Sequence, residues 1–330
     1  MWVSLYFVTN HTLRDTILLS SILTPFTITP TNDHNNNNPS ITSPPHHNHT
    51  TTSNHHQNAL PNPNPPTLTS FPPPNPNHHP SLPQTPSPNT TSNPSPNVLL
   101  LLHPTGDTST NLTPLAVALN LPETTTITLQ APTPLPFDLG GFHWGDDITF
   151  SPDGGLDMDA GFSRSVKVIH EVIRDVLVRK CGYKVRDVVI WGLGQGGMVG
   201  LEVARVLALK GVDGGDKDKD DGERCLGGVV SIGAPVGLDG GRSGSSSGGG
   251  VGKSKTPVLI AAGKEGDGTA VTAAGVRRTQ EWFEFVEVVR YKRKGDGMPR
   301  NREEMTPIMA FLARRLRSYK GVPEGSVEIS

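Results

Sequence analysis

Hydrophobic and polar positions divide the chain into two parts that meet near residue 97. In the first part, apolar residues are concentrated in Met1–Val8 and Ile17–Phe26 and are sparse elsewhere. In the second part, short apolar runs typical of buried strands alternate with segments whose apolar residues recur at helical spacing. The predicted strands are Val98–His103, Thr124–Leu129, Val188–Trp191, Gly228–Ile232, Pro257–Ala262 and Val286–Tyr291. The predicted helices are Asn111–Asn120, Phe162–Lys180, Gly197–Leu209, Ala270–Phe283 and a last helix that begins at an Asn301 cap and runs to about Ser318.

This alternation of strands and helices predicts an α/β fold, with a mostly parallel sheet and helices on both faces. Right-handed crossovers bring the carboxyl ends of the strands to one edge, where we expect the functional site. One domain is predicted at 98–320, followed by a tail at 321–330. Residues 211–224 and the Gly/Ser-rich residues 239–255 precede strands, and we expect both to be flexible surface insertions.

Composition separates residues 1–97 from the rest of the chain. This segment holds 19 of the 31 prolines and 9 of the 12 histidines, but only three charged residues. Such a Pro/Asn/His/Ser/Thr-rich sequence buries too little apolar surface to offset the entropy lost on ordering. We therefore predict a disordered, low-complexity tail that the folded domain does not need.

The charge balance and the cysteines exclude several classes of protein. With 29 basic and 31 acidic residues, the chain does not have the positive charge of a nucleic-acid binder. It contains no apolar run of the roughly 18 residues that a membrane span needs. Cys181 and Cys225 fall in no metal-binding spacing, so we expect no metal and no cofactor. The N-terminal residues lack the order of a secretory signal, and we expect a cytoplasmic protein.

The clearest chemical signal is a buried strand that runs directly into glycines and then into a helix, in Val188–Gly197. Gly192 and Gly196 fit the G-x-S-x-G elbow that presents the nucleophile of α/β-hydrolases. Gly192, Gly194 and Gly197 also satisfy the G-x-G-x-x-G pattern of dinucleotide-binding folds. The motif follows the third predicted strand, and no acidic residue ends the next one. This context favours the elbow and leaves dinucleotide binding as a second alternative.

Several segments in the same order resemble the phospholipase/carboxylesterase and acyl-protein thioesterase family of α/β-hydrolases. The resemblance covers about Val98–Leu316. Leu100–Asp107 resembles the family's L-H-G-x-G-D loop, and Ala131–Phe137 with Trp144 resembles its A-P…P-x-P-F…W segment. Gly192–Gly197 resembles its G-F-S-Q-G-G elbow. Pro257–Leu259 and Pro307–Leu312 resemble the last conserved segments of the family.

The resemblance implies a triad in which a Ser attacks an acyl carbonyl, a His accepts its proton and an Asp orients the His. The nucleophile position is Gly194, which has no side chain. The acid position is Asp267, although its spacing from Gly263 is longer than the family's G-x-x-D-x-x-V pattern. The base position is Asp296, and no histidine occurs after His170.

Backbone N–H groups form the oxyanion hole of this family, and they survive changes of side chain. The resemblance assigns them to Thr105 and Gln195. It also places His103 and Gly106 in the loop that carries Thr105, where His103 has a structural role.

We therefore interpret the chain as an α/β-hydrolase with the site architecture for carboxylic esters or acyl thioesters but without standard serine chemistry. Such a site could bind acyl chains, lipids or acylated proteins. The alternative is an active ester or thioester hydrolase with a non-standard group, such as a water activated by Asp267 or Asp296, or a relocated nucleophile such as Ser231. Glycine at the elbow also removes the strain that a side chain suffers there, about 1–3 kcal/mol.

Overall fold

A computed structural model describes residues 5–9, 95–137, 139–150, 156–157, 159, 161–210, 224–238, 253–266 and 268–318. Most of the predicted tail at 1–97, all of the tail at 321–330 and nearly all of the two predicted insertions lie outside the described residues. The described end of the second insertion pairs with the fold, because Ser254 N donates to Trp282 O at 2.8 Å.

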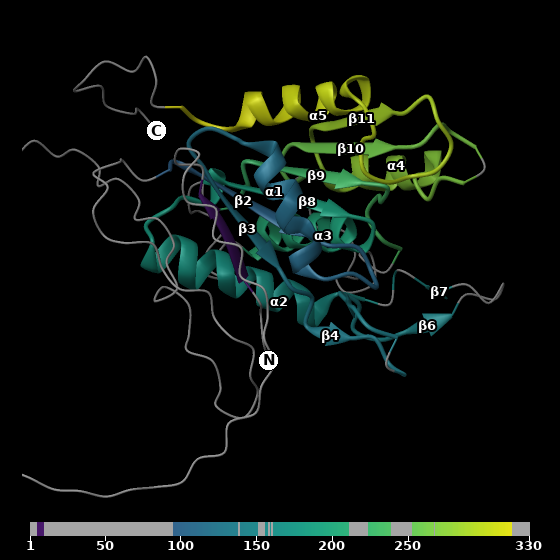
Figure 1. Cartoon of the computed structure of the whole chain (residues 1–330), viewed down its shortest axis with the longest axis horizontal. Helices are drawn as coiled ribbons and strands as arrows, with labels where there is room; N and C mark the ends of the chain where they lie inside the picture. Colours follow the sequence, from purple (N-terminus) through teal and green to yellow (C-terminus); the bar gives the residue numbers. More distant parts are fainter. Residues whose placement is uncertain are drawn as a thin grey trace, which may run out of the picture.

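A seven-stranded sheet forms the centre of the domain, and six of its strands are parallel. The order across the sheet is β1-β3-β2-β8-β9-β10-β11 (Figure 1). The parallel strands are β2 (Asn97–Leu102), β3 (Thr124–Leu129), β8 (Val188–Leu193), β9 (Gly228–Ile232), β10 (Val258–Ala262) and β11 (Val286–Arg290). The edge strand β1 (Leu5–Thr9) pairs antiparallel with β3, so it adds a strand that the sequence pattern did not predict.

Helices cover both faces of the sheet (Figure 1). Leu99 and Leu101 of β2 belong to the core cluster shared with α1 (Thr113–Leu119) and α5 (Arg302–Arg315). Val98 and Leu100 belong to the cluster shared with the helices of the other face, which are α2 (Ser163–Glu171), α3 (Gln195–Lys210) and α4 (Ala273–Trp282). Because successive strand residues point to opposite faces, a continuous apolar run such as Val98–Leu102 serves both layers.

Short elements complete the domain. They are the 3₁₀ turns Ser109–Leu112 and Val185–Asp187, and the two-stranded ribbons formed by β4 (Thr133–Pro134) with β5 (Phe142–His143) and by β6 (Thr149–Phe150) with β7 (Leu156–Asp157).

The predicted helix Phe162–Lys180 is α-helical only in its first half. Residues Val172–Lys180 form a π-helix, in which Cys181 N donates to Val176 O at 2.9 Å. Its buried residues are Val172, Ile173, Val176 and Leu177, a spacing that an α-helix would bury equally well. The apolar periodicity therefore predicted the buried face correctly but not the hydrogen-bonding pattern.

The predicted cap of the last helix is present in part. Asn301 accepts a hydrogen bond from Glu304 N at 2.9 Å. The Glu304 carboxylate, however, accepts from Arg300 N at 2.8 Å and from Arg293 Nε at 3.1 Å, instead of returning to the cap residue. A tertiary partner, Arg293, thus competes for the side chain that the capping-box pattern assigns to the helix end.

Asn97 forms hydrogen bonds that connect three segments at the amino edge of the sheet, so the folded domain includes residue 97. Its side chain is 1% exposed. Its Nδ2 donates to Glu123 O at 2.9 Å and to Arg317 O at 2.8 Å, and its Oδ1 accepts from Arg317 N at 2.7 Å. One amide therefore connects β2 to the turn before β3 and to the end of α5.

We expect Asn97→Ala to lower the free energy of unfolding by about 2–3 kcal/mol, because three partly buried hydrogen bonds contribute roughly 1 kcal/mol each. Urea denaturation of the full chain measures this as a lower midpoint with an unchanged slope. Asn111→Ala is the matched control, since Asn111 is exposed. Equal effects of the two substitutions would contradict the assigned role of Asn97.

Candidate active site

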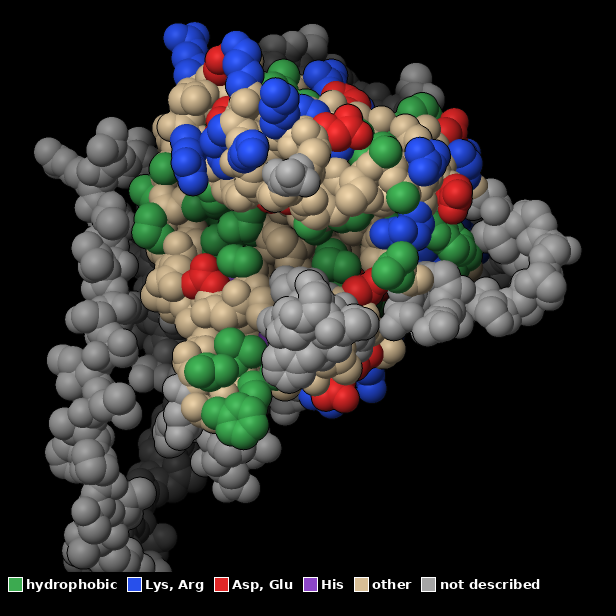
Figure 2. Space-filling view, turned by 90° about the vertical axis from the view of Figure 1, so that its right-hand side faces the viewer, with side chains coloured by type: hydrophobic (Ala, Val, Ile, Leu, Met, Phe, Trp, Pro, Cys, Tyr) green, Lys and Arg blue, Asp and Glu red, His purple; other side chains and the backbone are tan. Residues whose placement is uncertain are grey.

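The carboxyl edge of the sheet has a point where the connections diverge. The chain passes from β2 to β3 on one side and then returns to β8 on the other side of β2. α1 and α2 cross on opposite faces, so this edge is the topological switch point of the sheet, where open α/β folds bind their ligands. Figure 2 shows this edge of the molecule face on. The predicted site residues Thr105 and Gln195 follow these two strands.

The turn after β8 has the geometry of a nucleophile elbow. Gly194 lies between β8 and α3 at φ +52°, in the left-handed region that favours glycine. Its N–H donates to Ile232 O at 2.8 Å, and its carbonyl accepts from Gly197 N at 2.8 Å and Met198 N at 3.1 Å. A Cβ at Gly194 would meet only Pro104 Cβ, at 3.7 Å. The position is therefore strained for other residues but sterically open.

The other three glycines of the motif permit close backbone packing. A Cβ on Gly192 would lie 2.2 Å from Gly196 O, and a Cβ on Gly196 would lie 2.5 Å from Leu102 O. A Cβ on Gly197 would lie 2.3 Å from Ser231 Oγ. These glycines bring the first turn of α3 against β2, β8 and β9, and their presence requires no ligand.

The Gln195 side chain joins the elbow to the loop after β2. It is 2% exposed, and its Oε1 accepts from Trp144 N at 2.7 Å and from Thr105 Oγ1 at 2.9 Å. Gly106, in the same loop, donates its N–H to Phe142 O at 2.9 Å. Sequence reasoning considered only the backbone of Gln195 and missed this role of its side chain. The two backbones assigned to the oxyanion hole are therefore held in a fixed relation.

His103 lies beneath the loop and has a structural role. It is fully buried, and burial lowers the pKa of its imidazole, with partial compensation from a bond to the Pro104 carbonyl. Nδ1 donates to Pro104 O at 2.7 Å, while Nε2 accepts from Ala131 N at 3.0 Å and from Gln130 Nε2 at 2.8 Å. Trp144 Nε1 donates to His103 O at 2.7 Å. A neutral imidazole with both nitrogens engaged fixes the loop but is not available as a base.

The base position, Asp296, lies over the ends of β9 and β10. Asp267 is outside the described residues. Asp296 accepts from Gly263 N at 2.8 Å, Thr269 Oγ1 at 2.9 Å and Ala270 N at 2.7 Å. A Cβ on Gly233 would lie 2.7 Å from Asp296 Cβ, and Gly233 follows Ile232, the acceptor of the Gly194 N–H. Gly194 and Asp296 thus lie on the same edge, with the Asp296 carboxylate turned toward the loop that contains residue 267.

Arg293 holds the loop that carries Asp296. Its Nη1 donates to Gly295 O at 2.9 Å, its Nη2 donates to Met298 O at 2.9 Å, and the guanidinium lies 4.6 Å from the centre of the Tyr291 ring. Burial, reinforced by Glu304, raises the pKa of Tyr291 to about 12, so this phenol stays protonated at neutral pH. Tyr291 is therefore not available as a base.

Ser231, the candidate for a relocated nucleophile, is fully buried beneath α3, and its Oγ donates to Ala234 O at 2.6 Å. A substrate carbonyl cannot reach it without movement of the elbow.

His143, to which sequence reasoning assigned no role, is 3% exposed and lies near Gln195. An added Cβ on Gly145 would lie 3.3 Å from Gln195 Nε2 and 3.5 Å from His143 Nδ1. Burial and Arg164 lower the pKa of His143, and Asp147 partly offsets them.

The described residues contain no group of three or more His, Cys, Asp or Glu side chains arranged to hold a metal ion. Among the same residues, no helix is long and apolar enough to cross a membrane.

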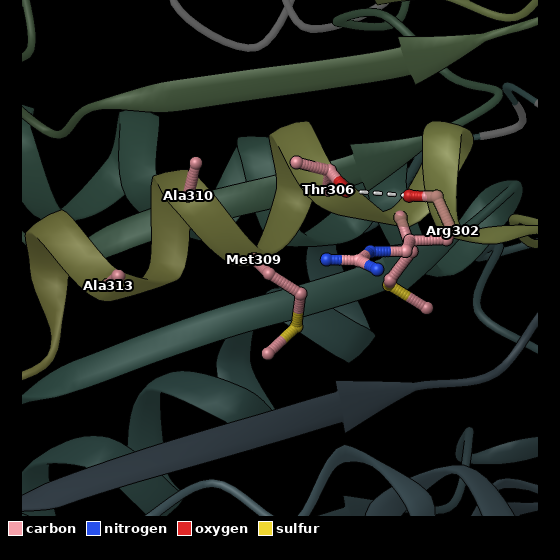
Figure 3. Close-up of a pocket in the computed structure, with 6 residues that line it drawn as sticks. Arg302, Thr306, Met309, Ala310 and Ala313 are labelled. Atoms are coloured by element: carbon pink, nitrogen blue, oxygen red, sulfur yellow. Dashed lines mark hydrogen bonds between the residues drawn. The ribbon is translucent and has the colours of Figure 1, made fainter.

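A cavity of ≈ 440 Å³ lies away from the elbow, along the outer side of α5. Its described lining is Arg302, Met305, Thr306, Met309, Ala310 and Ala313, and Figure 3 shows the labelled side chains on this single helix. It contains none of the predicted site residues.

Comparison with known proteins identifies the same region of the chain. Residues 87–211 match the family model described as Phospholipase/Carboxylesterase, and this range contains both the loop after β2 and the elbow. An uncharacterized hydrolase of Schizosaccharomyces pombe is 34% identical over 118 residues, which are 34% of this chain and 48% of that protein. An uncharacterized hydrolase of Mycosarcoma maydis is 37% identical over 109 residues, which are 32% of this chain and 41% of that protein. The match spans about half the length of these curated relatives or less.

Among solved structures, Zea mays acyl-protein thioesterase 2 is 19% identical, with a TM-score of 0.46 and coverage of 67% of this chain and 94% of that chain. Arabidopsis thaliana SOBER1 is 20% identical, with a TM-score of 0.47 and coverage of 67% and 99%. These likenesses are too distant to indicate an activity. The family model, however, matches the segment in which the elbow geometry and the loop motif occur, so residues 87–211 of this chain are similar to the phospholipase/carboxylesterase family.

Proposed function

We propose that the protein is an ester- or thioester-hydrolase homologue that has lost standard serine catalysis and retains an acyl-binding site. The observation that carries this proposal is Gly194, which occupies the elbow at φ +52° with no side chain to attack a carbonyl. In a serine hydrolase, the nucleophile and its base act as a unit. Without them, only oxyanion stabilisation and binding remain available.

The surroundings of Asp296 support the loss of the base. A general base needs a free lone pair directed at the proton that it removes. Asp296 instead accepts hydrogen bonds from three donors of the loop Gly263–Ala270. These donors compete with any catalytic water for the carboxylate. This argues against the alternative in which Asp296 activates a water molecule.

The second alternative, dinucleotide binding, has less support. The close backbone contacts at Gly192, Gly196 and Gly197 account for these glycines without a ligand. The strand after the motif, β9, ends at Ile232 and is followed by Gly233, not by the acidic residue that would bind a ribose hydroxyl. The family's chemistry on carboxylic esters makes an acyl group the favoured ligand class, carried by a lipid or by an acylated protein.

The proposal predicts that the full chain does not react with a fluorophosphonate probe and hydrolyses p-nitrophenyl esters no faster than buffer. The physical reason is the absence of an activated hydroxyl at Gly194. In-gel fluorescence and mass spectrometry measure the labelling, and Ser231→Ala serves as a control for reaction at the buried serine. Labelling of the wild-type chain at any residue would instead support a non-standard nucleophile.

Restoring both missing groups should restore reactivity. We expect Gly194→Ser with Asp296→His to give labelling at residue 194 and weak esterase activity, while each single substitution gives neither. A side chain at 194 has room, since the nearest atom to its Cβ is Pro104 Cβ at 3.7 Å. Gly194→Ser should cost about 1–3 kcal/mol of stability because of the left-handed backbone.

Asp296→His also removes three hydrogen bonds from the loop Gly263–Ala270. Thermal unfolding must therefore show that the double variant is folded before its labelling is interpreted. A folded double variant without labelling would contradict the assignment of residues 194 and 296 to the nucleophile and base positions.

A further inference from the structure

The carboxyl edge of the sheet exposes large apolar side chains beside the candidate site. Phe137 is 90% exposed and Leu139 is 71% exposed, both in the loop between β4 and β5. Leu238, which follows β9, is 71% exposed. In Figure 2 hydrophobic side chains are visible at the lower left and at the right of this face. Exposed apolar groups gathered on one face indicate an interaction surface.

The backbone holds Phe137 in this outward position at a cost. Phe137 has φ 59°, a left-handed conformation that is unusual for a bulky residue. Leu135 N donates to Gly141 O at 3.0 Å and so closes the loop. The base of the loop is fixed to the candidate oxyanion loop, since Phe142 N donates to Asp107 O at 3.1 Å. Retained backbone strain of this kind is concentrated at functional sites.

The opposite half of the same edge is basic. The loops after β10 and β11, together with the start of α5, carry five exposed basic side chains among their described residues: Lys264, Lys292, Lys294, Arg300 and Arg302. The exposed acidic side chains described there are Glu265 and Glu303, and Glu303 pairs with Lys292 at 2.6 Å. Figure 2 shows the Lys and Arg side chains gathered at the top of this face.

We propose that this face docks on an anionic lipid surface. Apolar side chains at a loop tip partition into the interfacial region of a bilayer, while lysines and arginines attract anionic headgroups. The two kinds of side chain occupy different loops of one face, which suits a flat partner with a charged surface and an apolar interior. Asp107 and the exposed Asp147 lie on the apolar half, so the electrostatic attraction comes from the β10–β11 half.

Docking in this orientation would direct the loops after β2 and β8 toward the lipid. An acyl chain could then enter the site directly from the membrane. The inference rests on the exposed loops and not on Gly194. It therefore holds or fails independently of the loss of serine catalysis.

Sedimentation of the full chain with vesicles tests the inference. We expect at least about tenfold stronger partitioning to phosphatidylcholine vesicles that contain phosphatidylserine than to phosphatidylcholine alone, because each basic residue near the surface adds roughly fivefold. The partitioning should weaken as salt rises. Equal partitioning to the two vesicle types would overturn the proposal.

Two pairs of substitutions separate the two contributions. Lys292→Glu with Lys294→Glu should reduce partitioning to anionic vesicles at least about tenfold. Phe137→Ser with Leu139→Ser should reduce it at least severalfold through loss of interfacial burial. Thermal unfolding confirms that each variant is folded. If either folded pair partitions like the wild-type chain, the proposal is wrong.

Matched controls lie at the opposite edge of the sheet. Phe285 is 52% exposed and directly precedes β11, so Phe285→Ser removes an exposed aromatic side chain from the amino edge. Lys180 and Lys210 are exposed at the ends of helices that lead into β8 and β9, and Lys180→Glu with Lys210→Glu gives the same change in net charge. The proposal expects partitioning within twofold of wild type for both controls, and losses as large as those of the test pairs would overturn it.

Discussion

The close approach of the first turn of α3 to the ends of β2, β8 and β9 is the constraint on which the site depends. Gly192 and Gly196 leave no room for a Cβ, because backbone atoms would lie 2.2 and 2.5 Å away. The chain must therefore turn at Gly194 in a left-handed conformation. The crossovers on opposite faces place this turn at the topological switch point of the sheet. This geometry is a property of the backbone and does not require a side chain at residue 194.

Buried polar groups fix the loop that faces the elbow. His103 joins the loop to Ala131 and Gln130, and Gln195 joins it to Trp144 and Thr105. Buried groups of this kind are costly when unpaired, so the network favours a single loop conformation. None of these bonds involves a catalytic side chain. A site organised in this way keeps its shape when catalysis is lost, which suits a role in binding.

In the loops over β9, β10 and β11, charged side chains form hydrogen bonds that hold the loops together. Asp296 joins Gly263 to Ala270, and Arg293 binds carbonyls of its own loop. These contacts stabilise the edge of the sheet and engage the carboxylate with the loop after β10. Lys292 and Lys294, from the same loop, remain exposed to solvent. The β11 loop thus combines a rigid interior with a basic outer surface.

The order of strands and helices, the helix cap at Asn301 and the glycine elbow follow from local patterns, because burial and turn geometry act over a few residues. The family resemblance located Gly194, Thr105 and Gln195 for the same reason. Four features could not be predicted in this way: the antiparallel edge strand β1, the π-helix Val172–Lys180, the hydrogen bonds of Asn97 and the side-chain bonds of Gln195. The π-helix has local bonds, but its apolar spacing fits an α-helix equally well. Each of the other three depends on a partner far away in the sequence, and no periodicity encodes which distant carbonyl or amide a buried polar group will meet when the layers pack.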